Sequence, residues 1–334
     1  MSVDRIELQT GYSISRIIKG GWHLAGGHGQ VDERTAIADM RAFVEAGVTT
    51  FDCADIYTGV EDLIGKFLRQ HQDAFSSGNL SQVQIHTKYV PDYDALATVT
   101  KADTARIIER SLKRLGVQRL DLVQFAWWDY NVPRYVETAL HLAALQKQGK
   151  IRYIGVTNFD AEHLQELLDA GVPVAANQVQ YSVLDHRVES DLNALATAYN
   201  IPYLCYGVVA GGFLSDRYLN IPDPTPPLEN RSLIKYRLII DEFGGYDAFQ
   251  DALHILRGIA NKHGVGIAEV ATRYILQKEY VAGVIIGARN RDHLSKLQQL
   301  STFVLDSNDL TVIQTVVDQA AGPVGPFYAL ERDK

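Results

Sequence analysis

The sequence is poor in the residues and patterns that mark several large classes of protein. Only two of its 334 residues are cysteines, Cys53 and Cys205, and they form no C-x-x-C pair, so we expect neither a disulfide framework nor a cysteine-based metal site. No run of 18 apolar residues occurs, and the N-terminus lacks the charged-then-apolar pattern of a secretion signal. We therefore expect a soluble, cytoplasmic protein that does not enter a membrane.

Stretches rich in lysine and arginine are missing as well. The formal net charge is −8, which disfavours nucleic acid or an anionic membrane surface as a partner. The glycine-rich fingerprints G-x-G-x-x-G and G-x-x-x-x-G-K-[ST] are absent, which counts against the usual phosphate-binding turns of nucleotide-binding domains. No spacing of His, Asp and Glu is typical of a metal site, so we expect no bound metal.

What the chain does have is a regular alternation of short apolar runs and longer amphipathic segments. The stretch IELQTGYSISRI (6–17) alternates apolar and polar residues around Thr10-Gly11, which predicts a β-hairpin. Eight predicted strands follow, at 16–21, 48–52, 83–88, 120–125, 153–158, 174–180, 203–207 and 282–287. Predicted helices lie near 33–46, 61–70, 104–116, 134–148, 160–170, 187–199, 247–263 and 290–300. Eight strands, each followed by a helix with no break in composition, predict one (β/α)8 TIM barrel domain over residues 1–334 rather than a doubly wound sheet.

One predicted connection is long. The segment 215–245, after the seventh strand, reads as a loop, and loops of this length are usually lids or binding segments. Its basic residues Arg231, Lys235 and Arg237 either meet a phosphate or simply face water.

Polar and aromatic side chains stand where many of the strands end. In a (β/α)8 barrel these carboxyl ends, and the loops after them, carry the active site. Asp52 ends the second strand, Lys88 ends the third, and Tyr57 follows Asp52 by five residues. One aspartate at a strand end is more often a structural cap, but these three residue types together indicate a site. The corresponding ends of strands five, six and seven carry Thr157, Asn158, Gln178 and Tyr206.

Five motifs, in order along nearly the whole chain, resemble the aldo-keto reductase family. They are GVTTFDCADIYTGVEDLIGKFL (47–68), HTKY (86–89), GKIRYIGVTNF (149–159), NQVQYS (177–182) and VIIGARNRDHL (284–294). The resemblance implies a (β/α)8 barrel that binds NAD(P)H without a Rossmann domain and reduces the carbonyl of an aldehyde or ketone to an alcohol.

The resemblance also implies how the reaction is divided among residues. Tyr57 would donate a proton to the carbonyl oxygen, with Lys88 and Asp52 as its tuning partners. A phenol with a pKa near 10 is a poor acid at neutral pH, and a nearby ammonium stabilises phenolate and lowers that pKa. Asp52 would keep Lys88 charged and fixed.

The cofactor contacts follow from the same resemblance. Thr157, Asn158 and Gln178 would hydrogen-bond the nicotinamide carboxamide, which needs both donors and acceptors. Tyr206 would stack on the nicotinamide face, and Trp22 would line the substrate pocket. Residues expected around the phosphates are Gly207, Gly211, Gly212, Leu214, Ser215, Arg217, Gly287, Ala288, Arg289, Arg291 and His293.

NADP(H) is favoured over NAD(H), because Arg289 and Arg291 suit a 2′-phosphate. The alternative, in which these arginines form an exposed helix face, stays open.

The fourth predicted strand ends in an unexpected residue. In LVQFAWWDY (122–130), Ala126 stands where the family usually has a histidine that hydrogen-bonds the substrate's carbonyl oxygen. Losing one such donor costs on the order of a hundredfold in rate. Trp127 and Trp128, next in the chain, favour an apolar or aromatic carbonyl substrate.

Three interpretations of Ala126 are open. It is an engineered replacement of the histidine, or a natural feature of a reductase with a roomier pocket. In the third interpretation the cofactor serves another purpose, either a redox-neutral lyase or isomerase reaction or a regulatory role with little turnover.

Overall fold

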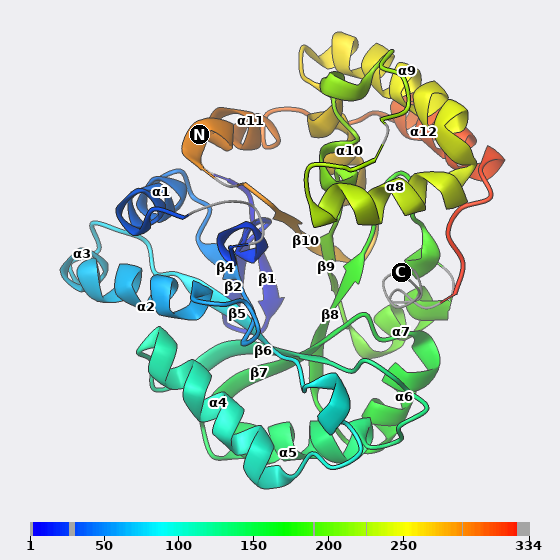
Figure 1. The fold of residues 1–334 in the computed structure, drawn as a ribbon. Helices are drawn as coiled ribbons and strands as arrows, with labels where there is room; N and C mark the ends of the chain where they lie inside the picture. Colours follow the sequence, from blue (N-terminus) through cyan, green and yellow to red (C-terminus); the bar gives the residue numbers. More distant parts are fainter. Residues whose placement is uncertain (1–2, 27–30, 190, 225, 289, 326–334) are drawn as a thin grey trace.

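Eight parallel strands close into a barrel in the computed structural model, which describes residues 3–26, 31–189, 191–224, 226–288 and 290–325 (Figure 1). Their order around the barrel is β10-β3-β4-β5-β6-β7-β8-β9. They are β3 Ile17–Gly20, β4 Thr50–Asp52, β5 Gln84–Tyr89, β6 Leu120–Ala126, β7 Ile151–Thr157, β8 Val174–Gln180, β9 Tyr203–Tyr206 and β10 Val281–Ile286. Every bound lies within two residues of the predicted strand, so the predicted (β/α)8 barrel is confirmed.

Helices surround the barrel and supply the outer layer of the core (Figure 1). They are α1 Glu33–Glu45, α2 Val60–Gln70, α3 Gln72–Ser76, α4 Lys101–Leu115, α5 Tyr135–Lys147, α6 Ala161–Asp169, α7 Asp191–Tyr199, α8 Arg231–Phe243, α9 Gly245–His263, α10 Ile267–Leu276, α11 Leu294–Gln299 and α12 Ser307–Gln319. Within the described residues, none of these helices combines the length and the apolar character needed to cross a bilayer.

Helix α4 shows how local sequence sets the boundaries. Thr100 accepts a hydrogen bond from the Asp103 amide (3.2 Å), and Asp103 accepts one from the Thr100 amide (3.2 Å), which forms a capping box. Gly116 ends the helix with φ of +71°, a conformation that glycine adopts without steric cost. The helix therefore begins three residues before the predicted 104.

Four helices, α3, α8, α10 and α12, were not predicted from the sequence. Helix α8 lies inside the segment 215–245 that was predicted to be a loop, because Leu233, Tyr236, Ile240 and Phe243 form an apolar stripe at helical spacing and Asn230 caps the first turn. Helix α10 was not predicted at all. Nine of its ten residues are buried in the structure, although Glu269, Thr272 and Arg273 recur at helical spacing in the sequence, so a helical period was present and was overlooked.

The N-terminal hairpin, β1 Arg5–Gln9 and β2 Tyr12–Ser15, closes the barrel at the end where the strands begin. Its side chains Leu8, Tyr12 and Ile14 join an apolar cluster in the barrel interior. The barrel strands contribute Ile18, Leu122, Ala175, Ala176, Leu204 and Ala282 to this cluster. The Tyr12 hydroxyl shares a 3.1 Å hydrogen bond with Nε2 of His86 inside the barrel. The predicted hairpin is thus the floor of the barrel interior, and His86 is a buried core histidine.

The floor should make stability sensitive to acid. Burial lowers the pKa of His86 to about 4, whereas an unfolded histidine titrates near 6.5. The unfolded chain therefore binds a proton that the native protein rejects, and stability falls as pH drops from about 6.5 toward 4. We expect His86 to account for a loss of roughly 3 kcal/mol.

The measurement is urea unfolding at pH 7, 6, 5 and 4 for the natural chain and for His86→Gln, whose amide can still bond to Tyr12. The variant should lose less stability on acidification than the natural chain. Equal acid losses in the two proteins would contradict the assignment.

Candidate active site at the carboxyl ends of the strands

A buried ion pair lies inside the barrel above the apolar floor. Lys88 of β5 donates to Asp52 of β4 with Nζ and Oδ2 2.6 Å apart, and the two side chains are only 6% and 5% exposed. Lys88 also donates to the backbone carbonyl of Cys53 at 3.0 Å. Burial by itself lowers the pKa of Lys88, but Asp52 and Tyr57 outweigh it and the pKa is raised. The ammonium is therefore held charged.

Two amides complete the coordination of Asp52. Gln178 of β8 donates from Nε2 to Asp52 Oδ1 at 2.7 Å and to Gln124 Oε1 at 2.7 Å. Gln124 of β6 donates to the same Asp52 oxygen at 2.9 Å. Sequence reasoning missed Gln124, although it lies two residues before Ala126 and a strand places residues i and i+2 on one face. The four side chains form a polar layer across the barrel.

Tyr57 lies at the mouth of the barrel, next to this layer. Its amide donates to the Ala54 carbonyl at 3.0 Å, which folds the chain back after β4. The Lys88 ammonium lies 5.2 Å from the centre of the phenol ring, and the Trp22 ring packs edge-on at 5.1 Å. Trp22 itself is 37% exposed. The structure thus brings together the predicted Asp52, Lys88, Tyr57 and Trp22.

The pKa of Tyr57 moves in the opposite direction from the sequence-based prediction. Burial raises the pKa of the phenol above its usual value, and the Lys88 ammonium offsets only part of that rise. The predicted lowering is wrong as a net direction, because the sequence shows the lysine but not the loss of solvation. The phenol is therefore protonated at neutral pH and remains able to donate.

Thr157 and Asn158 stand beside Tyr206 on the other side of the mouth. Asn158 has φ of +56°, and its Nδ2 donates to the Tyr206 hydroxyl at 3.0 Å. The Thr157 hydroxyl oxygen is buried and has no hydrogen-bond partner among the described residues. Buried polar groups normally have partners. An unpartnered hydroxyl next to an amide and a phenol therefore fits a ligand with hydrogen-bonding groups, such as a nicotinamide carboxamide.

The end of β6 separates Ala126 from the tryptophans that follow it. Ala126 pairs with Thr157 in register and is buried. Trp128 is half-buried, and its indole donates to the Pro91 carbonyl at 2.9 Å. Trp127 is fully buried among Phe125 and Tyr135, with its indole bonded to backbone carbonyls. Trp127 therefore belongs to the outer core, and the prediction that it lines the substrate pocket does not agree with its position.

The turn after β9 lies under α8. Gly207 and Gly211 have φ of +73° and +65°, and a Cβ at either position would overlap the Tyr236 ring of α8. Another side chain of α8, Lys235, lies 5.1 Å from the centre of the Tyr206 ring. The Arg237 guanidinium donates hydrogen bonds to the carboxylates of Asp223 and Asp241 (2.8 and 2.5 Å). The helix is thus anchored directly on the predicted cofactor turn.

The remaining residues predicted around the turn after β9 bond within the protein. Gly212 has φ of +106°, and its carbonyl accepts from the Ser215 hydroxyl at 2.6 Å. Leu214 is fully buried. Arg217 pairs with Glu229 at 2.9 Å on the surface.

The segment after β10 is the second predicted phosphate region. A Cβ at Gly287 would overlap the His23 ring, and Ala288 is buried. Arg291 is 63% exposed, with its Nε 3.6 Å from Asp39. His293 is exposed at the start of α11. Arg289 lies outside the described residues.

The fold and the arrangement of polar groups at its mouth agree with the comparison to known families. A sequence profile of the Aldo/keto reductase family matches residues 16–318. The chain belongs to this family. It is accordingly an oxidoreductase, and aldo/keto reductases use nicotinamide cofactors with small carbonyl substrates.

Relatives and a solved structure extend the match over almost the whole aldo/keto reductase chain. Aldo-keto reductase YhdN of Bacillus subtilis (strain 168) is 29% identical, over 96% of this chain and 95% of its own. L-glyceraldehyde 3-phosphate reductase of Escherichia coli O157:H7 is 26% identical, over 91% and 89%. The glycerol dehydrogenase AKR11B4 from Gluconobacter oxydans has a TM-score of 0.79 over 98% of this chain and 99% of its own at 22% identity, which shows the shared fold.

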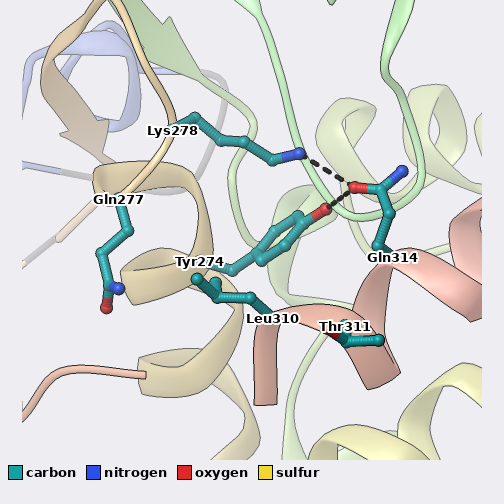
Figure 2. A pocket seen from close by; sticks show the side chains of 6 residues that line it. All are labelled: Tyr274, Gln277, Lys278, Leu310, Thr311 and Gln314. Carbon is teal, nitrogen blue, oxygen red and sulfur yellow. Dashed lines mark hydrogen bonds between the residues drawn. The ribbon is translucent and has the colours of Figure 1, made fainter. Parts of the chain in front are cut away.

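A separate pocket of this aldo/keto reductase lies outside the barrel, between α10 and α12 (Figure 2). The Tyr274 hydroxyl donates to Gln314 at 2.8 Å, and Lys278 donates to the same oxygen at 3.1 Å (Figure 2). Lys278 also pairs with Glu189 at 2.7 Å. These polar groups are satisfied by one another, so the pocket is part of the helix packing and the candidate site remains at the strand ends.

The buried pair in this reductase should behave as a unit. Removing one partner of a buried ion pair leaves an uncompensated charge and typically costs about 3–5 kcal/mol. We expect Lys88→Met to lower the free energy of unfolding by about that much, and Asp52→Asn/Lys88→Met to be more stable than Lys88→Met alone.

Urea unfolding of the two variants measures both effects. Arg41→Met is the matched control, because the Arg41–Glu45 pair is 53% and 51% exposed and should contribute less than about 1 kcal/mol. A double variant less stable than Lys88→Met would contradict the coupling.

Proposed function

We propose that this chain reduces an aldehyde or ketone to an alcohol with NADP(H), and that Tyr57 donates the proton. The observation that supports this most directly is the position of the Tyr57 phenol at the barrel mouth, 5.2 Å from the Lys88 ammonium, which a buried carboxylate holds in place. When bound, the nicotinamide supplies the hydride that adds to the carbonyl carbon.

The chain's own residues supply the proton that the carbonyl oxygen takes up. Tyr57 transfers its phenolic proton to the carbonyl oxygen, and the resulting phenolate is stabilised by the Lys88 ammonium 5.2 Å from the ring. Asp52 keeps that ammonium in place through the 2.6 Å contact. Burial raises the pKa of Tyr57 and makes it a weaker acid, and the Lys88 ammonium is the group that opposes this effect.

Cofactor recognition is proposed at two places. Thr157, Asn158 and Gln178 would hydrogen-bond the carboxamide beside the Tyr206 ring. The buried Thr157 hydroxyl, which has no partner among the described residues, supports this. Arg291, with Arg289 two residues earlier, favours the 2′-phosphate of NADP(H). The phosphate region also includes Gly207, Gly211, Gly212, Leu214, Ser215, Arg217, Gly287, Ala288 and His293.

The substrate is proposed to be apolar or aromatic. Trp22 and Trp128 are the partly exposed indoles near Tyr57 and Ala126. Ala126 supplies a methyl group where a hydrogen-bond donor to the carbonyl oxygen is expected from the family resemblance. This position favours a reductase of reduced or altered turnover. It is also the one observation in favour of a cofactor-binding role with little turnover, or of a redox-neutral reaction.

Ala126→His tests the role of the alanine. We expect the variant to oxidise NADPH about a hundredfold faster against a panel of aliphatic and aromatic aldehydes, because a donor to the developing oxyanion is restored. Tyr57→Phe in both backgrounds is the control and should abolish turnover.

Ala126→Asn introduces a smaller hydrogen-bond donor at the same position, in case a histidine is too large for this buried site. If neither substitution increases the rate in a folded protein, the alanine belongs to the protein's own chemistry. If, in addition, the unsubstituted chain oxidises NADPH with no aldehyde or ketone of the panel, bulky ones included, carbonyl reduction is the wrong assignment.

Thr157→Val tests the carboxamide contact. It should weaken NADPH binding about tenfold, the loss of one hydrogen bond, and leave unfolding in urea nearly unchanged, since the hydroxyl has no partner among the described residues. Thr87→Val is the matched control, because the buried Thr87 hydroxyl donates to Glu61 at 2.7 Å. It should reduce stability and leave NADPH affinity unchanged. Destabilisation by Thr157→Val with no change in affinity would contradict the contact.

A further inference from the structure

A second buried lysine, Lys19, lies outside the barrel wall. Its neighbour Ile18 belongs to the apolar cluster inside the barrel, so the alternation of β3 directs Lys19 outward, toward α1. The residue is 4% exposed, its Nζ donates to the Ala288 carbonyl at 3.0 Å, and the ammonium lies 4.7 Å from the centre of the Phe43 ring. Lysine is seldom buried unless it is paired.

The charge opposite Lys19 is Asp39 of α1. Asp39 is also buried, and its Oδ1 lies 3.6 Å from Nε of Arg291, whose side chain extends into solvent. Burial lowers the pKa of Lys19 to about 8, and Asp39 opposes that effect. Lys19 lies over Phe43, one helical turn from Asp39 on the same face of α1, and Arg291 approaches Asp39 from the solvent side. A buried and an exposed cation therefore flank this part of α1, which carries a single buried carboxylate.

We propose that Lys19 is a positioning residue for the adenosine end of the cofactor: it fixes the segment after β10 through Ala288 and balances Asp39, so that Arg291 can leave Asp39 and bind a 2′-phosphate. This inference rests on the proposed binding of NADP(H). It adds residues from β3 and α1 to a region that the sequence motif placed only after β10.

The argument is electrostatic. When Arg291 turns to a phosphate, Asp39 loses its 3.6 Å partner while it stays buried. An unpaired buried charge is strongly unfavourable. The ammonium of Lys19 reduces the cost of leaving Asp39 without Arg291, because Lys19 stays in the barrel wall whether Arg291 contacts Asp39 or a phosphate. Ligands without a 2′-phosphate do not draw Arg291 away, so their binding does not depend on Lys19.

Calorimetric titration of the ligand-free protein tests this without any turnover. The two probes are adenosine 2′,5′-bisphosphate, which carries the 2′-phosphate, and ADP, which lacks it and carries a second phosphate on the 5′ side instead. Lys19→Met should weaken the bisphosphate roughly tenfold or more and change ADP less than about twofold. Lys147→Met, an exposed lysine of α5 well away from α1 in Figure 1, is the control for net charge and should change neither.

The double variant Lys19→Met/Asp39→Asn separates charge balance from a merely structural role. It carries neither buried charge, so Arg291 is free to bind phosphate and the bisphosphate affinity should return to within about threefold of the natural chain. An affinity as weak as that of Lys19→Met would show that Lys19 only holds Ala288, and would overturn the inference. The inference is also wrong if Lys19→Met weakens the binding of both probes equally, or of neither.

Binding of the two probes to the unsubstituted chain tests the proposed preference for NADP(H) itself. If this chain does not prefer adenosine 2′,5′-bisphosphate to ADP, the proposed NADP(H) binding fails, and the inference fails with it. If it does prefer the bisphosphate and only the Lys19 variants behave otherwise than expected, the proposed function stands and the inference alone is wrong.

Discussion

The ion pair between Asp52 and Lys88 is the constraint around which the upper half of the barrel is organised. A charged ammonium in the interior is tolerated only with a close carboxylate and further hydrogen bonds. Both oxygens of Asp52 are used, one by Lys88 and the other by Gln124 and Gln178. Four strands are thereby joined by side chains at one level, and the phenol of Tyr57 is placed over a fixed positive charge.

Much of this arrangement could be predicted from the sequence, because parallel strands buried on both faces read as compact apolar runs and their carboxyl ends gather at one rim. What escaped prediction depended on three-dimensional surroundings. Gln124 looked like a polar interruption of a strand until Asp52 was found opposite it. Trp127 looked like a rim residue but packs in the outer core. The pKa of Tyr57 was predicted from its charged neighbour, whereas burial decides its direction.

Two lysines are buried close to the two ends of the proposed cofactor site, and the positive charge of each is compensated in a different way. Lys88 points into the barrel and keeps its carboxylate as a permanent partner. Lys19 points out of it, over the face of α1 that carries Asp39, and Asp39 is also the partner of the exposed Arg291. A permanent pair suits a residue that must hold one position through a reaction. A shared carboxylate suits a residue whose neighbour has to move when a ligand arrives.

The hairpin that covers the lower end of the barrel has a kinetic consequence. Tyr12 and its neighbours occupy the space between the strand starts, so the polar layer is reached only from the rim. Two molecules that use one entrance, with one seated deeper than the other, must arrive in a fixed sequence and depart in the reverse sequence. With the hairpin 5–15 as the floor, a cofactor seated deeper than its substrate would have to bind first and leave last.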